Sequence, residues 1–400
     1  MFNKRILEIS PSLTLELSAK AKNLINNGVD IINLTVGEPD FNTPNYILKG
    51  AEEGIKKGFT KYTATSGIEE LKNQIIEKFN NYNGITYNLD NILVSTGAKQ
   101  CLFNAILSLV NENDEVIIPA PYWVSYTEMV KIAGGKSIIV NTSRENGFKV
   151  TVEELVNNLT NETKLLILNN PNNPTGSVYT KEELERIANW AIGNNIFIIS
   201  DEIYERLTYQ HKHVSLASLN DEIKEKTITI SGYSKTYAMT GWRLGYCAAN
   251  RELIKLMTSI QSHSTACANS IAQYAGYIAL REENNNPDID HMIQQFSKRR
   301  ELAMDFLMKN SKLKFNKPNG AFYIFIDIST LKKKMYKGIE LKSSFDISRI
   351  LLDEFRLAVV PGLAFGNDDY IRISYATDEN SIIEGLKRLI QLERDVNSVI

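Results

Sequence analysis

The sequence predicts an α/β fold, with a mainly parallel, doubly wound sheet in a large domain and a smaller α+β domain. Through the middle of the chain, short β-branched runs alternate with segments of helical periodicity, and this order is typical of parallel sheets. The 400 residues also exceed what a single small core requires. A polar break at residues 282–287 predicts a boundary. We therefore expect residues 45–285 to form the large domain, and residues 1–44 with 286–400 to form the small one.

The composition is typical of a soluble globular protein and excludes several classes of function. With 43% hydrophobic and 23% charged residues and a net charge of -2, the chain lacks the basic surface of nucleic-acid-binding proteins. No apolar run is long enough to span a membrane, and the N-terminus lacks the apolar core of a secretion signal. We therefore expect neither a nucleic-acid partner nor a membrane partner.

The cysteines and histidines show no spacing that is typical of disulfides or metal sites. The three cysteines are Cys101, Cys247 and Cys267. An odd, low count is typical of a reducing cytoplasm, and we expect the protein to reside there. His211 and His213 flank Lys212, and we expect them in a solvated loop, so no metal site is predicted.

The first part of the chain predicts alternating helices and strands. We expect helices over 12–28, 44–57, 68–81 and 96–109, and strands over 31–36 and 91–95. Gly37 follows the first strand, where a glycine either forms an ordinary turn or lets a ligand approach the backbone closely. The string Thr96-Gly97-Ala98-Lys99 follows the second strand at a helix start. Free N–H groups and the helix dipole can hold a phosphate there, although many such turns bind nothing.

The middle of the chain predicts strands whose ends carry candidate functional residues. We expect strands over 115–118, 137–140, 164–168, 196–200 and 227–230, and helices over 182–194, 252–260 and 265–281. Trp123 follows one strand and either packs in the core or stacks on a planar ring. Asp201 ends another strand, where ligands gather in open sheets, although a carboxylate there can also cap a helix. Lys235 follows a third strand and is either a surface lysine or a buried amine that attacks a carbonyl.

Two further candidates lie in a loop and in the C-terminal part. Asn173 belongs to the loop 169–176, which is rich in Asn and Pro and is either an ordinary turn or a stiff frame for a side chain. The C-terminal part predicts a helix over 289–309, an edge strand over 320–326 and a strand over 370–376. Arg372 in the last strand ordinarily faces solvent, and the alternative is a two-pronged contact with a carboxylate.

Several of these segments resemble, in the same order, the motifs of class I pyridoxal-phosphate-dependent aminotransferases. The matching strings are Val36-Gly37-Glu38-Pro39-Asp40-Phe41, Pro121-Tyr122-Trp123, Asn173-Pro174-Thr175-Gly176, Ser234-Lys235 with Met239-Thr240-Gly241-Trp242-Arg243-Leu244-Gly245, and Ile371-Arg372-Ile373-Ser374-Tyr375-Ala376. The ordered set covers almost the whole chain, so it is far more specific than any single match. The resemblance implies the fold type I scaffold of pyridoxal-phosphate-dependent transferases and a homodimer.

The resemblance also implies pyridoxal 5′-phosphate as the cofactor and assigns a role to each candidate. Lys235 would carry the cofactor and move a proton as general base and acid, Asp201 would pair with the pyridine nitrogen, and Tyr204 would complete the catalytic set at O3′. The other implied cofactor contacts are Gly97, Ala98, Lys99, Trp123, Asn173, Arg243 and, from the other subunit of the homodimer, Tyr62. The implied substrate contacts are Gly37, Lys99, Trp123, Asn173 and Arg372.

One position departs from the family pattern. Many members carry a serine three residues before the lysine, and this chain has Gly232 there. Either Ser231 or Ser234 could supply the missing hydrogen bond to the phosphate, and the sequence does not choose between them.

The substrate is indicated by the string Gly97-Ala98-Lys99-Gln100, which resembles the prokaryotic aspartate aminotransferase subgroup. In that subgroup the lysine meets the distal carboxylate of the substrate. The resemblance implies transfer of the amino group from L-aspartate to 2-oxoglutarate in a ping-pong cycle, with amino acids and 2-oxo acids as the small-molecule partners. Ser10 stands where prephenate-accepting members carry a lysine, which counts against prephenate, although the sequence leaves its use open. An aromatic or broad-range aminotransferase and a C–S β-lyase remain alternatives, whereas a sensing domain fused to a DNA-binding head is not expected.

Overall fold

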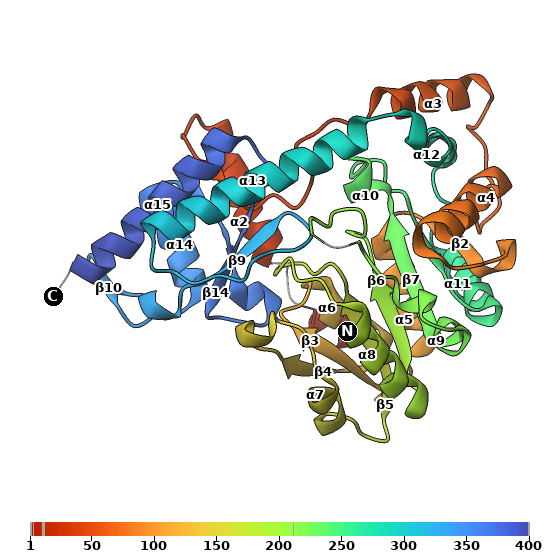
Figure 1. Ribbon diagram of the computed structural model, residues 1–400, viewed down its shortest axis with the longest axis horizontal. Coiled ribbons are helices and arrows are strands. Elements are labelled where there is room, and N and C mark those ends of the chain that lie inside the picture. Colours follow the sequence, from red (N-terminus) through yellow and green to blue (C-terminus); the bar gives the residue numbers. More distant parts are fainter. Residues whose placement is uncertain (1, 3, 10–12, 211, 399–400) are drawn as a thin grey trace.

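The computed structural model describes residues 2, 4–9, 13–210 and 212–398. Its central feature is a seven-stranded sheet with helices on both faces, beside a smaller three-stranded sheet with its own helices (Figure 1). In sheet order the seven strands are β2 (Ile92–Ser95), β8 (Gly245–Ala248), β7 (Thr227–Gly232), β6 (Phe197–Asp201), β5 (Thr163–Asn169), β3 (Glu115–Ala120) and β4 (Lys136–Asn141). Only β8 runs antiparallel to its neighbours, so the predicted mainly parallel sheet is confirmed.

The strands of the large sheet are buried on both faces. Successive side chains of a strand point to opposite sides of the sheet, and here both sets pack against helices. Ile198 of β6 packs with Leu184 and Leu166 in one core cluster. Its neighbour Ile199 packs with Ile106 in the cluster on the other face. The helices of this part are α3 (Asn45–Lys56), α4 (Glu69–Lys78), α5 (Ala98–Leu109), α6 (Ser125–Ala133), α7 (Val152–Asn157), α8 (Lys181–Gly193), α9 (Asp221–Lys226), α10 (Tyr233–Thr236), α11 (Arg251–Ser264) and α12 (Ser270–Arg281).

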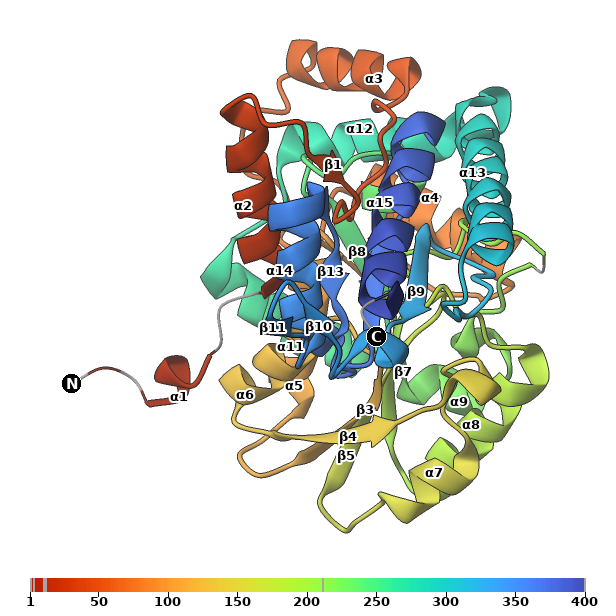
Figure 2. The ribbon, with the colours of Figure 1, turned by 90° about the vertical axis from the view of Figure 1, so that its left-hand side faces the viewer.

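The smaller sheet is antiparallel and has the order β13 (Val360–Pro361), β14 (Tyr370–Ser374) and β9 (Tyr323–Asp327). As expected, the strand near residues 320–326 lies at an edge. Helices α2 (Leu13–Asn26), α14 (Ser344–Phe355) and α15 (Glu379–Ser398) lie near this sheet, and α13 (Asp288–Asn310) runs alongside (Figure 2). Further short elements are α1 (Lys4–Leu7), β10 (Met335–Tyr336) and β11 (Ile339–Glu340).

The N-terminal segment joins the C-terminal part of the chain. Strand β1 (Ile32–Asn33) pairs in parallel with β12 (Leu357–Ala358). Leu34 then belongs to the same core cluster as the residues of β9 and α15. These contacts support the division into residues 45–285 and residues 1–44 with 286–400, which stays a prediction.

Several boundaries differ from the expected ones. Helix α12 begins at Ser270 instead of residue 265, because the side chain of Asn269 accepts a hydrogen bond from the Ala272 amide and caps the helix. Helix α11 extends to Ser264 instead of ending at residue 260. The expected start of the first helix at Ser12, like the prephenate argument from Ser10, lies outside the described residues. Among the described residues, no helix is both long and apolar enough to cross a membrane.

Candidate active site

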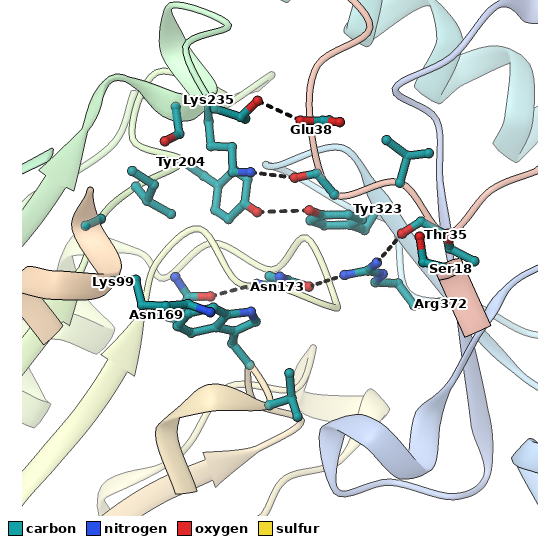
Figure 3. Close-up of a pocket in the computed structure, with 18 of the residues that line it drawn as sticks. Ser18, Thr35, Glu38, Lys99, Asn169, Asn173, Tyr204, Lys235, Tyr323 and Arg372 are labelled. Carbon is teal, nitrogen blue, oxygen red and sulfur yellow. Dashed lines mark hydrogen bonds between the residues drawn. The ribbon is translucent and has the colours of Figure 1, made fainter. Parts of the chain in front are cut away.

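A cavity of about 650 Å³ opens at the carboxyl ends of the parallel strands and reaches the smaller sheet (Figure 3). The predicted site residues that line it are Gly37, Ala98, Lys99, Trp123, Asn173, Asp201, Tyr204, Lys235, Arg243 and Arg372. The strand register explains this convergence, because Asn169 at the end of β5 lies opposite Asp201 at the end of β6. Ligands bind at this edge of open α/β sheets.

Lys235 lies on α10, directly after β7, and points into the cavity. Its Nζ donates a hydrogen bond of 2.5 Å to the carbonyl oxygen of Gly37. Burial lowers the pKa of Lys235 to about 8, against the opposing effect of the Glu38 carboxylate. An amine with this pKa is uncharged in a useful fraction near neutral pH and can attack a carbonyl.

Asp201 is the buried carboxylate of the cavity and is 4% exposed. Tyr126 Oη donates to its Oδ2 at 2.6 Å, and the Ile203 amide donates to Oδ1 at 3.3 Å. Burial raises the pKa of Asp201 to about 6, although the bond from Tyr126 works in the other direction. A cation beside this carboxylate would offset part of the energy that burial of its charge costs and would lower its pKa.

The start of α5 forms a cradle of the kind that binds phosphate. Gly97 caps the helix with φ of 81°, and a Cβ added there would lie 2.6 Å from Arg243 Nη2. A Cβ on Gly245 of β8 would overlap the Ala98 backbone nitrogen. Both glycines are therefore required by close approach, which places the guanidinium of Arg243 against the free amides of the helix start.

Lys99 and Trp123 form one side of the cavity. The Lys99 Nζ lies 4.8 Å from the centroid of the Trp123 ring, within the range of a cation–π contact. Desolvation and the positive charge of Arg243 lower the pKa of Lys99. In the part of the chain that the structure describes, no carboxylate pairs with the Lys99 ammonium.

Arg372 lies at the opposite side of the cavity and is only 5% exposed, so the solvent-facing alternative for this arginine is wrong. Its Nη1 donates to Asn173 Oδ1 at 3.0 Å, and its Nη2 donates to the Thr35 carbonyl at 2.8 Å. Its Nε has no hydrogen-bond partner among the described residues. A buried guanidinium with a free donor is suited to an anionic ligand.

Tyr323 is a cavity residue that the sequence reasoning missed. Its hydroxyl lies 2.9 Å from that of Tyr204, and its ring lies under the guanidinium of Arg372, 4.3 Å from centroid to Cζ. In the register of β9 and β14, Tyr323 pairs with Ser374, so it lies diagonally across from Arg372. Both strands were predicted, but their antiparallel pairing, which brings Tyr323 next to Arg372, was not.

Two residues considered as phosphate contacts lie outside the cavity of this chain. Tyr62 is not among the residues that line the cavity, and it is 90% exposed on the loop after α3. Ser231 donates its hydroxyl to Glu205 Oε1 at 2.6 Å, away from the cavity, whereas Ser234 lines the cavity. Of the two serines left open by the sequence, only Ser234 therefore lines the cavity.

The expectation of a solvated loop at His213 is wrong. This histidine is 5% exposed, and its Nε2 lies 2.8 Å from Glu202 Oε2. Ser215 Oγ also donates a hydrogen bond to Glu202, to Oε1 at 2.9 Å. His211, its sequence neighbour, lies outside the described residues.

Glu202, His213 and Glu205 together have the spacing of a metal site, with ligand atoms within 4.8 Å of one another. Glu205 is nevertheless paired with Lys78, and it accepts a further bond from Asn83 at 2.9 Å. The charge of Glu205 is therefore compensated by Lys78 within the protein, which is typical of a buried ion network.

Comparison with known proteins points to the same family that the residues of the cavity indicate. A sequence model of the family described as aminotransferase class I and II matches residues 29–389. An aspartate aminotransferase of Bacillus sp. strain YM-2 is 44% identical over 387 residues, covering 96% of this chain and 97% of the relative. The crystal structure of the aspartate aminotransferase from Rhizobium meliloti has a TM-score of 0.94 at 38% identity and covers 99% of both chains. That of the aromatic aminotransferase from Pyrococcus horikoshii OT3 has a TM-score of 0.87 at 39% identity, covering 94% of this chain and all of that one.

Proposed function

This chain belongs to the class I and II aminotransferase family, whose members depend on pyridoxal 5′-phosphate, and on that premise we propose that it transfers the amino group of L-aspartate to 2-oxoglutarate. The transaminase activity and its cofactor follow from the family. The choice of donor and acceptor is supported by the names of the relatives and by the charge of the cavity. The two half-reactions would follow in ping-pong order at one site.

The residues of the cavity fit the cofactor. Lys235 offers an amine of lowered pKa, and Asp201 offers a buried carboxylate for a ring nitrogen. The free amides at the start of α5, with Arg243 and Ser234, offer donors for a phosphate. When bound, the cofactor would withdraw electrons from the substrate Cα, which is chemistry that no side chain of the protein supplies.

The protein would supply binding, orientation and proton transfer. We assign the α-carboxylate of the substrate to Arg372 and Asn173, because the guanidinium is held by Asn173 and still has a free donor. The Lys235 amine would take the proton from the substrate Cα and return it to C4′ of the cofactor. Trp123 would cover one face of the cofactor ring, and Tyr204 would donate to its O3′.

The observation that carries the proposed substrate is a second cation across the cavity from Arg372. Figure 3 shows Lys99 and Arg372 on either side of Asn173. The cavity lining contains the cations Lys22, Lys99, Lys235, Arg243 and Arg372, against the carboxylates Glu38 and Asp201. After a phosphate is bound, this excess of positive charge suits a substrate with two carboxylates, as aspartate and 2-oxoglutarate have.

An aromatic or broad-range aminotransferase is the second candidate, because the cavity is also rich in aromatic rings. Trp123, Tyr126, Tyr204, Tyr323 and Phe365 all line it. These rings could pack against an aromatic donor, and a neighbour in structure is named an aromatic aminotransferase.

An assay of donor, acceptor and product separates the candidates. With L-aspartate, the purified protein should form oxaloacetate only when 2-oxoglutarate is present. Faster turnover of tyrosine or phenylalanine at equal concentration would replace the proposal with the aromatic alternative. Release of ammonia and pyruvate from a β-thioether amino acid, without any 2-oxo acid, would instead indicate the C–S β-lyase.

We further propose a cytoplasmic homodimer in which Tyr62 of each subunit contacts the cofactor phosphate of the other. Tyr62 is 90% exposed, and Leu48 and Ile55 of the neighbouring α3 are also exposed. Tyr62 does not line the active-site cavity of its own subunit, and this supports a role across an interface. The three free cysteines are consistent with a reducing compartment.

A further inference from the structure

Gln261 of α11 is a buried polar residue for which the proposed chemistry has no direct use. It is 0% exposed, and all four hydrogen-bonding positions of its amide are filled. Its Oε1 accepts from Ser95 Oγ at 2.5 Å and from Asn104 Nδ2 at 3.2 Å. Its Nε2 donates to the carbonyl oxygens of Val94 at 2.8 Å and Thr65 at 2.7 Å. Because a carbonyl oxygen can only accept, the orientation of this amide is determined by its partners.

The partners of Gln261 belong to two segments with different tasks. Ser95 ends β2 directly before the helix start that forms the phosphate cradle, and Asn104 lies on that helix. Thr65 lies on the loop that carries Tyr62, three residues further along. The two segments also touch directly, since the Val94 amide donates to the Ser66 carbonyl at 3.0 Å.

We propose that Gln261 is a positioning residue for the cofactor phosphate in both sites of the dimer. Within its own subunit it holds the start of α5 through Ser95 and Asn104. Through Thr65 it holds the loop that presents Tyr62 to the other subunit. This inference rests on the proposed function, in which Tyr62 contacts the phosphate of the partner's cofactor. A change at Gln261 in one subunit therefore weakens cofactor binding in both sites.

Gln273 of α12 provides a matched control. It is also 0% exposed. Its Nε2 donates to Thr63 Oγ1 at 2.9 Å and to the Ala268 carbonyl at 2.9 Å, and its Oε1 accepts from the Ile68 amide at 2.8 Å. It therefore contacts the Tyr62 loop, and none of these partners belongs to the phosphate cradle. Gln261→Met and Gln273→Met each remove one buried amide of the same size. The two variants differ in whether the phosphate cradle of the same subunit loses a contact.

The first experiment measures the dissociation constant of pyridoxal 5′-phosphate from each homodimer by absorbance titration of the cofactor-free protein. Loss of Gln261 should raise this constant about tenfold or more, since buried partners are left unpaired on both segments. Thermal unfolding of the cofactor-free proteins is measured alongside. A lower unfolding temperature with an unchanged dissociation constant would show a purely structural role and overturn the proposal.

The second experiment uses hybrid dimers that contain one working site. A Tyr62→Phe subunit supplies Lys235, and a Lys235→Ala subunit supplies Tyr62. The readout is the cofactor trapped on Lys235 by borohydride at increasing cofactor concentration. Gln261→Met should weaken trapping when placed in either subunit, whereas Gln273→Met should weaken it only in the Lys235→Ala subunit.

The outcomes separate this inference from the proposed function. If Gln261→Met in the Lys235→Ala subunit leaves trapping unchanged while the hybrid still works, the role across the interface is wrong. A second outcome is that the hybrid with Gln261 intact in both subunits binds the cofactor no better than its parent homodimers. That result would contradict the shared site of the proposed function, and with it the role of Gln261 across the interface. The homodimer titration then still decides whether Gln261 supports the phosphate cradle of its own subunit.

Discussion

Several charged side chains of the cavity lack a full set of hydrogen-bond or ion-pair partners within the part of the protein that the structure describes. Arg372 keeps a free Nε donor, and Lys99 has no carboxylate partner among the described residues. Burial also shifts the pKa of Lys235 downward and that of Asp201 upward, in each case toward the uncharged form. A site of this kind gains most from ligands that bring the opposite charges, and two predictions follow from this at the residue scale.

The first prediction concerns Lys99→Ala. The kcat/KM for L-aspartate should fall by about one to two powers of ten, because one charge-assisted hydrogen bond contributes roughly 1.5–3 kcal/mol. The value for an uncharged donor such as alanine should change little. Steady-state kinetics with both donors at saturating cofactor provide the measurement.

Lys22→Ala is the matched control, because Lys22 is an exposed lysine of α2 that lines the same cavity. Water and salt screen this exposed charge, unlike the partly desolvated one of Lys99, so the loss of Lys22 should affect the two donors alike. Equal losses for both donors in Lys99→Ala would assign this lysine to the cofactor and remove the basis for an acidic substrate.

The second prediction concerns the pH dependence of cofactor uptake. The uncharged amine of Lys235 is the reactive form, and its pKa lies at about 8 instead of the ordinary 10.5. Uptake of pyridoxal 5′-phosphate by the cofactor-free protein should therefore accelerate as pH rises through about 8 and level off above it. Stopped-flow absorbance across this pH range gives the midpoint.

A simple amine such as N-acetyl-lysine amide, treated in the same way, accounts for the titration of the cofactor itself. The protein and the model amine should have clearly different midpoints. A shared midpoint near that of ordinary lysine would show that the burial of Lys235 does not tune its reactivity.

At the scale of elements, the phosphate cradle depends on how closely β8 approaches the start of α5. Gly245 is the point of contact, and a Cβ there would overlap the Ala98 nitrogen. Gly245→Ala should push the two elements apart, raise the cofactor dissociation constant and destabilise the protein by about 1–3 kcal/mol. Cofactor titration and chemical denaturation measure the two effects.

Gly193→Ala serves as the control for this change. Gly193 ends α8, and a Cβ there would meet nothing within 4 Å. This variant should keep the cofactor affinity and be neutral or slightly more stable, because alanine favours a helix over glycine. If Gly245→Ala also keeps the parental affinity, close approach at this glycine is not what shapes the cradle.

The same strand shows why some elements could be predicted and others could not. Strands such as β5 and β6 carry continuous apolar runs that predict buried strands from local pattern alone. The string of β8, Gly-Tyr-Cys-Ala, has no β-branched residue, and its pairing with β2 and β7 makes it a strand. Helix α8, which was expected over 182–194, also depends on local features, since Thr180 and Glu183 form a capping box at its start.

At the scale of the whole molecule, the exposed Tyr62 is the feature that calls for a second subunit. Sedimentation equilibrium should give twice the chain mass of 45.2 kDa. Tyr62→Ala should sediment as a dimer too but bind the cofactor more weakly, since one contact to the phosphate is lost. A monomer that retains full activity would contradict the shared site.

The sequence by itself determined the chemistry of this protein. The lysine segment, the Asn-Pro-Thr-Gly loop and the Ile-Arg-Ile-Ser-Tyr-Ala strand are continuous strings, so their residues and order can be read without a fold. The alternation of strands and helices is likewise local, because it depends on periodicity and on caps within a few residues.

Only the tertiary structure decided which residues meet. It buried Arg372 beside Asn173 and His213 beside Glu202, and it placed Tyr323 under the arginine. It also joined Gln261 to Thr65, 196 positions away along the chain. Such contacts depend on the pairing of strands and the packing of helices far apart in sequence, and no local pattern encodes which buried polar group will find which partner.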